Sequence, residues 1–230
     1  MRLWRPIRGL GGKQIEFIPG KLIGEMMTKD SNQEYEIIEK GDLVMLRTLA
    51  KTDIDHYKRW QTQGEWRLLD APWAQNVSKE KKDKESKKKQ TNTQDASVPK
   101  KQASIKDDSV PKIRAVIATL ENKPLGWVNR YVGKNSQLVW FVGIDICEDD
   151  YLNRGYGTEA LKLWINHLFA NSEYHKLCLD TWSFNPRMTR VAEKIGFIPE
   201  GIQRHMQFWE GEWLDLMHYG MLREEWENMR

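Results

Sequence analysis

The segment Arg154-Gly155-Tyr156-Gly157-Thr158 carries residue types that can bind an anion. It ends a loop after a predicted strand and opens a predicted helix. Backbone N–H groups at a helix start have no intrahelical acceptor, and the helix dipole favours negative charge there. The glycines would let a pyrophosphate approach the main chain, and Arg154 adds positive charge. Because a lone Gly-x-Gly also occurs in ordinary strand–helix turns, the prediction depends on the surrounding elements.

A second motif, Asn185 to Phe197 (NPRMTRVAEKIGF), follows further along the chain. Pro186 is suited to the first turn of a helix, and Gly196 is suited to its end. A helix is therefore predicted over 186–195. The strand predicted just before it, Leu177–Trp182, places this motif at a second strand-to-helix junction.

The elements around these motifs predict a mixed α/β (α+β) fold. Alternating, β-branched and aromatic segments predict strands, and apolar residues at helical spacing predict helices. Strands are expected at Tyr35–Ile38, Leu43–Thr48, Ile113–Leu120, Leu125–Val132, Leu138–Ile146, Leu177–Trp182, Phe197–Ile198 and Trp213–Met221. Helices are expected at Ile54–Gln61, from Gly155 onward, and at 186–195. The helical region that begins at Ile54 is expected to end at Asp70–Trp73. The order predicts a mostly antiparallel central sheet, flanked by helices, with one parallel crossover.

The domain organisation follows from changes in composition. Residues 1–41 contain several glycines and are interpreted as an N-terminal extension packed on a domain spanning 42–230. Residues 77–111 have almost no large apolar side chain and are predicted to form a mobile Lys-rich insertion. The net charge is +3. Residues 77–112 hold 11 Lys against 6 Asp or Glu. The remainder is therefore slightly acidic, which argues against a nucleic-acid-binding body.

Several classes of protein are disfavoured by the composition. No apolar run approaches the length of a membrane span, and the basic N-terminus is not followed by the apolar run of a secretion signal. The two cysteines, Cys147 and Cys178, fit no zinc spacing and are interpreted as reduced thiols of a cytoplasmic protein. The histidines lack metal-binding spacing as well, so no metal is expected.

Together, the two motifs resemble the acetyl-CoA-binding core of the GNAT superfamily of N-acetyltransferases. The resemblance covers roughly Leu43 to Arg223, apart from the insertion, and is strongest from Gly143 to Gly201. The opening and closing segments look like the ribosomal-protein N-terminal acetyltransferases. The middle, with Gly143-Ile144-Asp145 and the Asn185 motif, looks more like the aminoglycoside 6′-N-acetyltransferases. The resemblance implies the GNAT fold and acetyl-CoA as cosubstrate.

The resemblance also implies which residues contact the cofactor. These are Ile146 and Cys147 beside the pantetheine, Arg154, Gly155, Tyr156, Gly157 and Thr158 around the pyrophosphate, and Asn185 and Arg190 on the second motif. Two positions depart from the family pattern. Ala192 stands where many members have a tyrosine that protonates the leaving thiolate, and Leu152 stands where a Gln or Arg is usual. Tyr151, Tyr156 and Ser183 are alternative proton donors.

Asp145 and Asp180 are the candidate catalytic residues. An ammonium must lose a proton before its nitrogen can attack a thioester, and a strand carboxylate beside the cofactor could accept that proton. Asp145 occupies the position of the working aspartate in the aminoglycoside enzymes, and Asp180 is expected on the neighbouring strand. The alternatives are a surface-facing strand residue for Asp145 and a turn cap for Asp180. Residues 148–150 are interpreted as a solvated acidic loop.

The implied activity is acetyl transfer from acetyl-CoA to a primary amine by direct, base-assisted attack. The acceptor stays open between a ribosomal or other protein N-terminus and a small aminoglycoside-like or polyamine-like cation. Trp66, Trp73, Trp127 and Trp140 are candidate pocket walls, with core packing as the alternative. A non-catalytic GNAT-fold module that binds CoA or a partner is the alternative function. The sequence leaves the oligomeric state open, with a dimer as one option.

Overall fold

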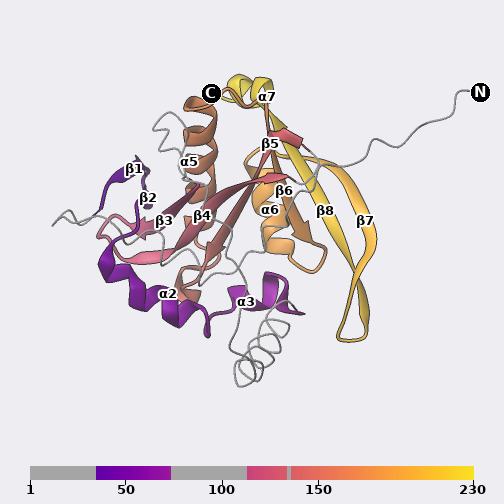
Figure 1. Cartoon of the computed structure of the whole chain (residues 1–230), viewed down its shortest axis with the longest axis horizontal. Coiled ribbons are helices and arrows are strands. Elements are labelled where there is room, and N and C mark those ends of the chain that lie inside the picture. The colour runs from indigo at the N-terminus through magenta and orange to yellow at the C-terminus, as the bar shows by residue number, and fades with distance from the viewer. Residues whose placement is uncertain (1–34, 74–112, 134–135) are drawn as a thin grey trace, which may run out of the picture.

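The computed structural model describes residues 35–73, 113–133 and 136–230 (Figure 1). These residues build one eight-stranded sheet in the order β1-β2-β3-β4-β5-β6-β8-β7. The strands are β1 (Ile37–Lys40), β2 (Val44–Arg47), β3 (Arg114–Thr119), β4 (Pro124–Gly133), β5 (Ser136–Ile146), β6 (Lys176–Trp182), β7 (Ile198–Trp209) and β8 (Glu212–Leu222). Among these described strands, only the β5–β6 pair is parallel. The predicted mixed, mostly antiparallel sheet with one parallel crossover is confirmed.

Short and long helices flank this sheet. They are η1 (Lys51–Asp53), α2 (Ile54–Trp60), α3 (Trp66–Leu69), η2 (Asp149–Tyr151), α5 (Tyr156–Ala170), α6 (Pro186–Lys194) and α7 (Arg223–Asn228). α5 begins right after Gly155, as the glycine-containing turn predicts. None of the helices in the described ranges is long and apolar enough to cross a membrane.

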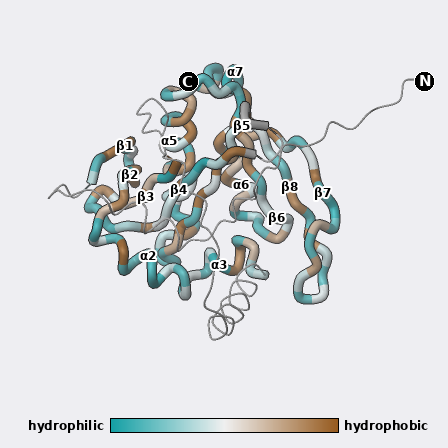
Figure 2. The backbone as a smooth tube through the Cα atoms, in the orientation of Figure 1, coloured by the Kyte–Doolittle hydropathy of each residue, from teal (hydrophilic) through white to brown (hydrophobic). Residues whose placement is uncertain are grey.

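The two faces of the sheet have different cores. In β3, Ala115 and Ile117 point to the face covered by α5, whereas Val116 points to the face covered by α2 and α3. The larger core gathers the apolar stripe of α5, with Leu161, Trp164 and Leu168 fully buried. Figure 2 shows hydrophobic and hydrophilic residues alternating along α5 and the central strands, as expected for elements with one buried side.

The smaller core lies under α2 and α3. It joins Tyr57 and Trp60 of α2 to Val116, Trp127 and Cys147 of the sheet. The rings of Tyr57 and Trp127 are stacked with centroids 5.4 Å apart. This packing fixes α2 and α3 over β3 and β4.

The β5–β6 pair separates soon after it forms. Its recorded register consists of Trp140 opposite Leu177 and Phe141 opposite Cys178. Beyond these residues β5 continues to Ile146 and β6 to Trp182, and these described stretches do not pair with one another. The C-terminal halves of the two strands therefore border a gap in the sheet.

A carboxylate anchors the first hairpin to the start of α5. Glu159 accepts hydrogen bonds from the backbone N–H groups of Asp42, Leu43 and Val44 at 3.0, 2.7 and 2.8 Å. Gly41 lacks a side chain at this place, and a Cβ there would lie 2.7 Å from the Glu159 carboxyl carbon. The β1–β2 turn and the first turn of α5 are thus held together by one side chain.

Some expected boundaries differ from the structure. β1 belongs to the sheet, so the sheet begins before residue 42. β7 runs to Trp209 instead of ending at Ile198, and α7 was not predicted. Pro72 and Trp73 are helical again after the break at Asp70. The predictions for residues 1–34 and for the insertion at 77–111 lie outside the described residues.

Candidate active site

The glycine-containing turn adopts the conformation that its sequence predicts. Gly155 is the N-cap of α5 with φ of +91°, a left-handed conformation that favours glycine. A Cβ at Gly157 would approach Ile146 Cγ1 to 3.3 Å, so the first turn of α5 packs closely against β5. Thr158 lies in that first turn, and Arg154 is exposed. The helix start with its N–H groups therefore lies beside the end of β5.

The second motif forms the start of α6 on the same side of the sheet as α5. Asn185 is the N-cap, and its Oδ1 accepts a hydrogen bond from the Met188 N–H at 3.1 Å. Arg190 is exposed one turn further on. Ala192 is completely buried in the core that α6 shares with α5. The two predicted cofactor motifs thus flank the gap between β5 and β6 from one face.

The edge of β5 that faces the gap has backbone groups that pair with no other strand in the described part of the chain. The Cys147 N–H donates to the Leu125 carbonyl at 2.7 Å, toward β4. Because successive residues of a strand direct their N–H groups to opposite edges, the Ile146 N–H is directed toward the gap. Burial, together with the charges of Asp145 and Glu148, raises the pKa of the Cys147 thiol. This thiol is suited to packing and not to acting as a nucleophile.

Asp145 and Asp180 lie on the opposite face, the one toward α2 and α3. Asp145 is the cross-strand partner of Trp127, whose ring belongs to the core under α2. Asp180 follows Cys178, the partner of Phe141, by two residues and so shares this face. The structure therefore brings both predicted aspartates to one side of the sheet, on the two strands that border the gap.

A third carboxylate, Asp70, acts on this site and was missed by sequence reasoning. Asp70 is the C-cap residue of α3. Although the residue is exposed as a whole, partial removal of water from its carboxyl group raises the pKa. Burial raises the pKa of Asp145 well above its usual range, the charge of Asp70 raises it further, and Arg114 opposes the shift. A carboxyl group with a raised pKa is a stronger proton acceptor once it is ionised.

Asp180 has a histidine partner that the sequence did not single out. His218 Nδ1 lies 2.7 Å from Asp180 Oδ1, and the two residues face each other across the β6–β8 ladder. An ionised carboxylate can only accept, so this contact places a proton on Nδ1. The pairing depends on the register of two strands that lie far apart in the sequence, so no local sequence pattern predicts it.

Several buried polar atoms near Asp145 have no hydrogen-bond partner within the described part of the chain. Trp66 Nε1 and Asn129 Oδ1 are two of them, whereas the Trp127 indole lies against Asp145 and a hydrogen bond from it lowers the pKa of that carboxyl group. Trp66 meets Trp127 edge to face with ring centroids 5.3 Å apart, and Asn129 lies over Gly143 on β5. Unsatisfied buried polar groups are rare in folded proteins, and a cluster of them is typical of a site that takes water or a ligand.

Aromatic rings line the outer end of the same face. Trp73 packs on Trp182 with centroids 4.6 Å apart and lies 6.0 Å from the ring of Trp209. Trp66, Trp73 and Trp127 are therefore on the side of the candidate aspartates. Trp140 is not, because it is buried on the α5 side and its ring stacks on Tyr174.

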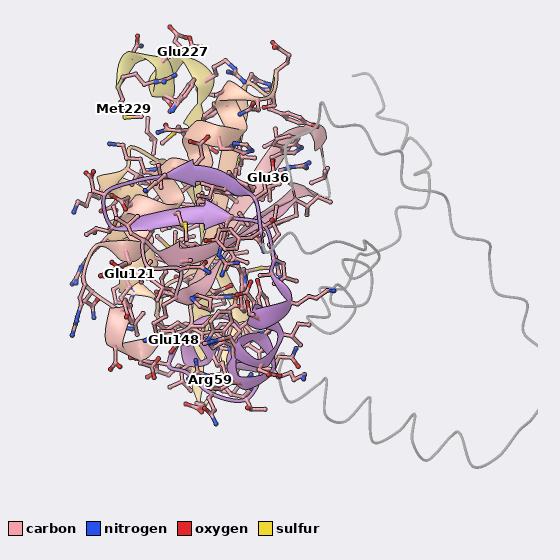
Figure 3. All side chains as sticks on the ribbon, turned by 90° about the vertical axis from the view of Figure 1, so that its left-hand side faces the viewer. Glu36, Arg59, Glu121, Glu148, Glu227 and Met229 are labelled. Atoms are coloured by element: carbon pink, nitrogen blue, oxygen red, sulfur yellow. The ribbon has the colours of Figure 1, made fainter. Side chains whose placement is uncertain are left out.

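The acidic loop after β5 is more ordered than predicted. Glu148 accepts a hydrogen bond from Trp60 Nε1 at 2.8 Å and pairs with Arg59, and Figure 3 shows Arg59 and Glu148 close together at the α2 end of the molecule. Asp149 accepts the Glu65 N–H at 2.9 Å. Asp149 and Asp150 are exposed, as the interpretation of 148–150 as a solvated loop predicts, whereas Glu148 is partly buried by its contacts with α2.

A charged contact links the two sides of the gap. Glu65, at the start of α3, binds Arg187 of α6 with 2.7 Å between Oε1 and NH2. Since the Glu65 backbone is held by Asp149, the loop after β5, helix α3 and helix α6 form one connected network. This network fixes the groups on the far side of the gap relative to Asp145.

The family is established by comparison with known proteins. Residues 44–198 match the model described as an acetyltransferase (GNAT) domain, and the chain therefore belongs to the GNAT family. It is 33% identical over 79 residues to the SPbeta prophage-derived uncharacterized N-acetyltransferase YokL of Bacillus subtilis, covering 34% of this chain and 45% of YokL. It is 30% identical over 78 residues to the "Putative ribosomal N-acetyltransferase YdaF" of the same organism, covering 34% and 43%. The chain thus spans somewhat less than half the length of these curated relatives.

Solved structures share the fold. The GNAT-family acetyltransferase from Bacillus anthracis superposes with a TM-score of 0.57 at 17% identity, covering 80% of this chain and 98% of the other. The spermidine N-acetyltransferase from Vibrio cholerae, solved in complex with CoA and spermine, gives the same TM-score at 16% identity and the same coverage. The GNAT fold implied by the two motifs is confirmed.

Proposed function

We propose that this protein is an acetyl-CoA-dependent N-acetyltransferase that acetylates a primary amine by direct transfer. The observation that carries the proposal is the separation of β5 from β6 beyond Phe141 and Cys178. This gap has a glycine-capped helix start on one face and the carboxylate of Asp145 on the other. A thioester and an amine could meet there without either displacing part of the sheet.

The cofactor side of the proposal uses the α5 and α6 face. The phosphate groups of acetyl-CoA would bind the turn from Arg154 to Thr158, where helix N–H groups and the Arg154 charge favour an anion. The free edge of β5 at Ile146 offers an N–H to the pantetheine amides. Asn185 and Arg190 would contact the cofactor from α6. The left-handed Gly155 and the close approach at Gly157 support this assignment.

The acceptor side uses the α2 and α3 face. Asp145 would accept a proton from the ammonium, so that the neutral nitrogen can attack the thioester carbonyl carbon. Its raised pKa suits this role, because a base is most effective when its pKa approaches the working pH. Trp66 and Asn129 offer polar atoms that have no partner in the described ranges and that could hold the acceptor or its water near Asp145.

A small polyamine-like cation is the acceptor class that this face favours. Asp70, Asp145 and Asp180 supply negative charge, and the rings of Trp73 and Trp182 supply surfaces that attract cations. The neighbouring Vibrio cholerae structure is named for spermidine acetylation, which agrees with this choice. The name of YdaF favours a ribosomal protein N-terminus as the second candidate.

Two measurements test the proposed function in order. Isothermal titration with acetyl-CoA should show saturable one-to-one binding. A thiol-release assay should then show turnover with spermidine, an aminoglycoside or an N-terminal peptide, and the ratio of kcat/KM values ranks the acceptor classes. Binding without turnover would instead support a CoA-binding module, and no binding at millimolar acetyl-CoA would contradict both.

We also propose that the acetyltransferase domain begins near residue 35 and not at residue 42. β1 pairs with β2 over Ile37 to Lys40, and the turn after it is anchored to α5 by Glu159. A chain starting at residue 35 should therefore fold more stably than one starting at residue 42. Equal urea midpoints of unfolding for the two chains would instead support a domain that begins at residue 42, as predicted from the sequence.

A further inference from the structure

His218 and Asp180 form a dyad whose second nitrogen is unused among the described residues. Nδ1 of His218 is 2.7 Å from Asp180 Oδ1, and Nε2 is buried without a partner in the described part of the chain. With the proton on Nδ1, Nε2 carries a lone pair. A carboxylate that orients an imidazole in this way prepares it to accept a proton, since the carboxylate stabilises the imidazolium that forms.

The β7 residue opposite this dyad leaves space on the Asp145 face. Gly201 is the β7 residue opposite His218, and a Cβ built there would meet nothing within 4 Å. Other titratable groups on this part of the face are Lys176, Cys178 and Asp180 of β6, Tyr131 of β4 and Glu200 of β7, and Lys176 pairs with Glu200 at 2.7 Å. The charge of Asp180 also helps to raise the pKa of Tyr131, so side chains of β4, β6 and β8 interact on this face beside the gap.

The chemistry of amine acetylation needs a second proton acceptor. An ammonium has three N–H bonds and the amide product keeps one, so two protons leave the nitrogen while the N–C bond forms and the C–S bond breaks. One proton ends on the thiolate sulfur and the other in solvent. The position at which many family members have a tyrosine is the buried Ala192, which carries no hydroxyl.

We propose that His218 Nε2 accepts the second of these two protons, after Asp145 has accepted the first. The imidazolium lies against the Asp180 carboxylate until it passes the proton on to the thiolate or to solvent, which returns His218 to its neutral form. This role rests on the proposed function and adds a catalytic residue to it. A purely structural dyad would hold β6 to β8 without affecting proton transfer.

Nitrogen-15 NMR of the full chain tests the state of the dyad independently of turnover. Protein with nitrogen-15-labelled histidine should show one imidazole that is protonated at Nδ1 and unprotonated at Nε2 at neutral pH. The signals of this imidazole should be absent from the spectrum of His218→Asn. Spermidine added with coenzyme A, a pair that cannot react, should shift that Nε2 resonance. A proton on Nε2, or a resonance that spermidine does not shift, would overturn the proposal.

Kinetics of matched variants test the catalytic step. His218→Asn keeps an amide that can donate to Asp180 but removes the Nε2 lone pair, so kcat should fall about 100-fold or more with the unfolding midpoint nearly unchanged. The limb of the kcat–pH profile that reports the imidazole should disappear as well. His205→Asn, on the same hairpin with its ring stacked on Trp213, is the control and should match the wild type.

The outcomes separate this role from the proposed function. A wild type that acetylates no amine overturns both. An active wild type with an equally active His218→Asn and an unchanged pH profile overturns the role of His218 alone. Loss of kcat and of the pH limb in His218→Asn, with His205→Asn unaffected, supports it.

Discussion

Asp145 and Trp127 lie directly opposite each other in the β4–β5 ladder, and both point to the face covered by α2 and α3. This pairing places a carboxyl group against a buried indole, and the hydrogen bond from that indole opposes the rise in the carboxyl pKa. It also explains why water is largely removed from the carboxyl group, which raises its pKa. The candidate base is therefore defined by its cross-strand neighbour as much as by its own position.

Replacing Asp145 by asparagine should separate chemistry from cofactor binding. Asp145→Asn keeps the shape but cannot accept a proton, so we expect kcat to fall about 10²–10⁴-fold. The dissociation constant for acetyl-CoA should stay nearly constant, because the predicted phosphate contacts lie on the other face. Titration calorimetry and a thiol-release assay measure the two quantities. Equal losses in both would remove Asp145 from the role of base.

The same variant should stabilise the protein at neutral pH. A raised carboxyl pKa means that the native state binds the proton more tightly than the unfolded state, so this contribution to stability is lost as pH rises through the native pKa. The amide of Asp145→Asn does not ionise, so the variant avoids this loss. Each unit of raised pKa corresponds to about 1.4 kcal/mol, or about 3–5 °C in Tm, above that pKa.

Thermal unfolding between pH 4 and pH 8 measures this effect. The Tm difference between Asp145→Asn and wild type should grow as pH increases. Asp55→Asn is the control, because Asp55 pairs with Lys58 on the exposed side of α2. A Tm difference for Asp145→Asn that is flat with pH would show that the carboxyl group is not perturbed.

A large side chain at Gly157 should abolish acetyl-CoA binding. The Cβ of an alanine would already lie 3.3 Å from Ile146 Cγ1, and a leucine would force the first turn of α5 away from β5. Gly201→Ala is the matched control, since its Cβ meets nothing within 4 Å. Calorimetry should show no saturable binding for Gly157→Leu and wild-type affinity for Gly201→Ala. Wild-type affinity in Gly157→Leu would refute the assignment of the phosphate-binding turn.

Glu159→Gln should weaken the fold at the start of α5. The amide keeps one accepting oxygen but turns an NH2 group toward backbone N–H donors, so at least one charge-assisted hydrogen bond is lost. We expect a loss of about 1.5–3 kcal/mol in the free energy of unfolding, measured in urea. The matched Glu173→Gln should change it little, because the Glu173 side chain makes none of these contacts to the β1–β2 turn. If both variants unfold alike, the three N–H contacts contribute nothing.

Elements with a strong local pattern could be predicted from the sequence. β3, β4 and β5 were expected within one or two residues, because their side chains alternate between two cores. The starts of α5 and α6 were expected because glycine, asparagine and proline mark helix ends. β7 was missed beyond Ile198, since most of its residues are exposed and no hydrophobic alternation identifies the strand.

The parts of the site that sequence reasoning missed depend on long-range contacts. Asp70 reaches the surroundings of Asp145 from the end of α3, and His218 meets Asp180 through the register of β8 against β6. Glu148 loses its expected exposure because Trp60, far away in the chain, donates to it. Such partners become visible only when the sheet is assembled, whereas Asp145 could be found from a local motif.

The two faces of the gap have a consequence for the order in which substrates are added. The predicted phosphate-binding turn lies on the α5 side, and the carboxylates of Asp145 and Asp180 lie on the α2 side. Neither substrate would then block the entrance of the other, and the buried Cys147 offers no nucleophile to store an acetyl group between them. Initial-rate lines for the two substrates should therefore intersect, as in a random sequential mechanism that passes through a ternary complex.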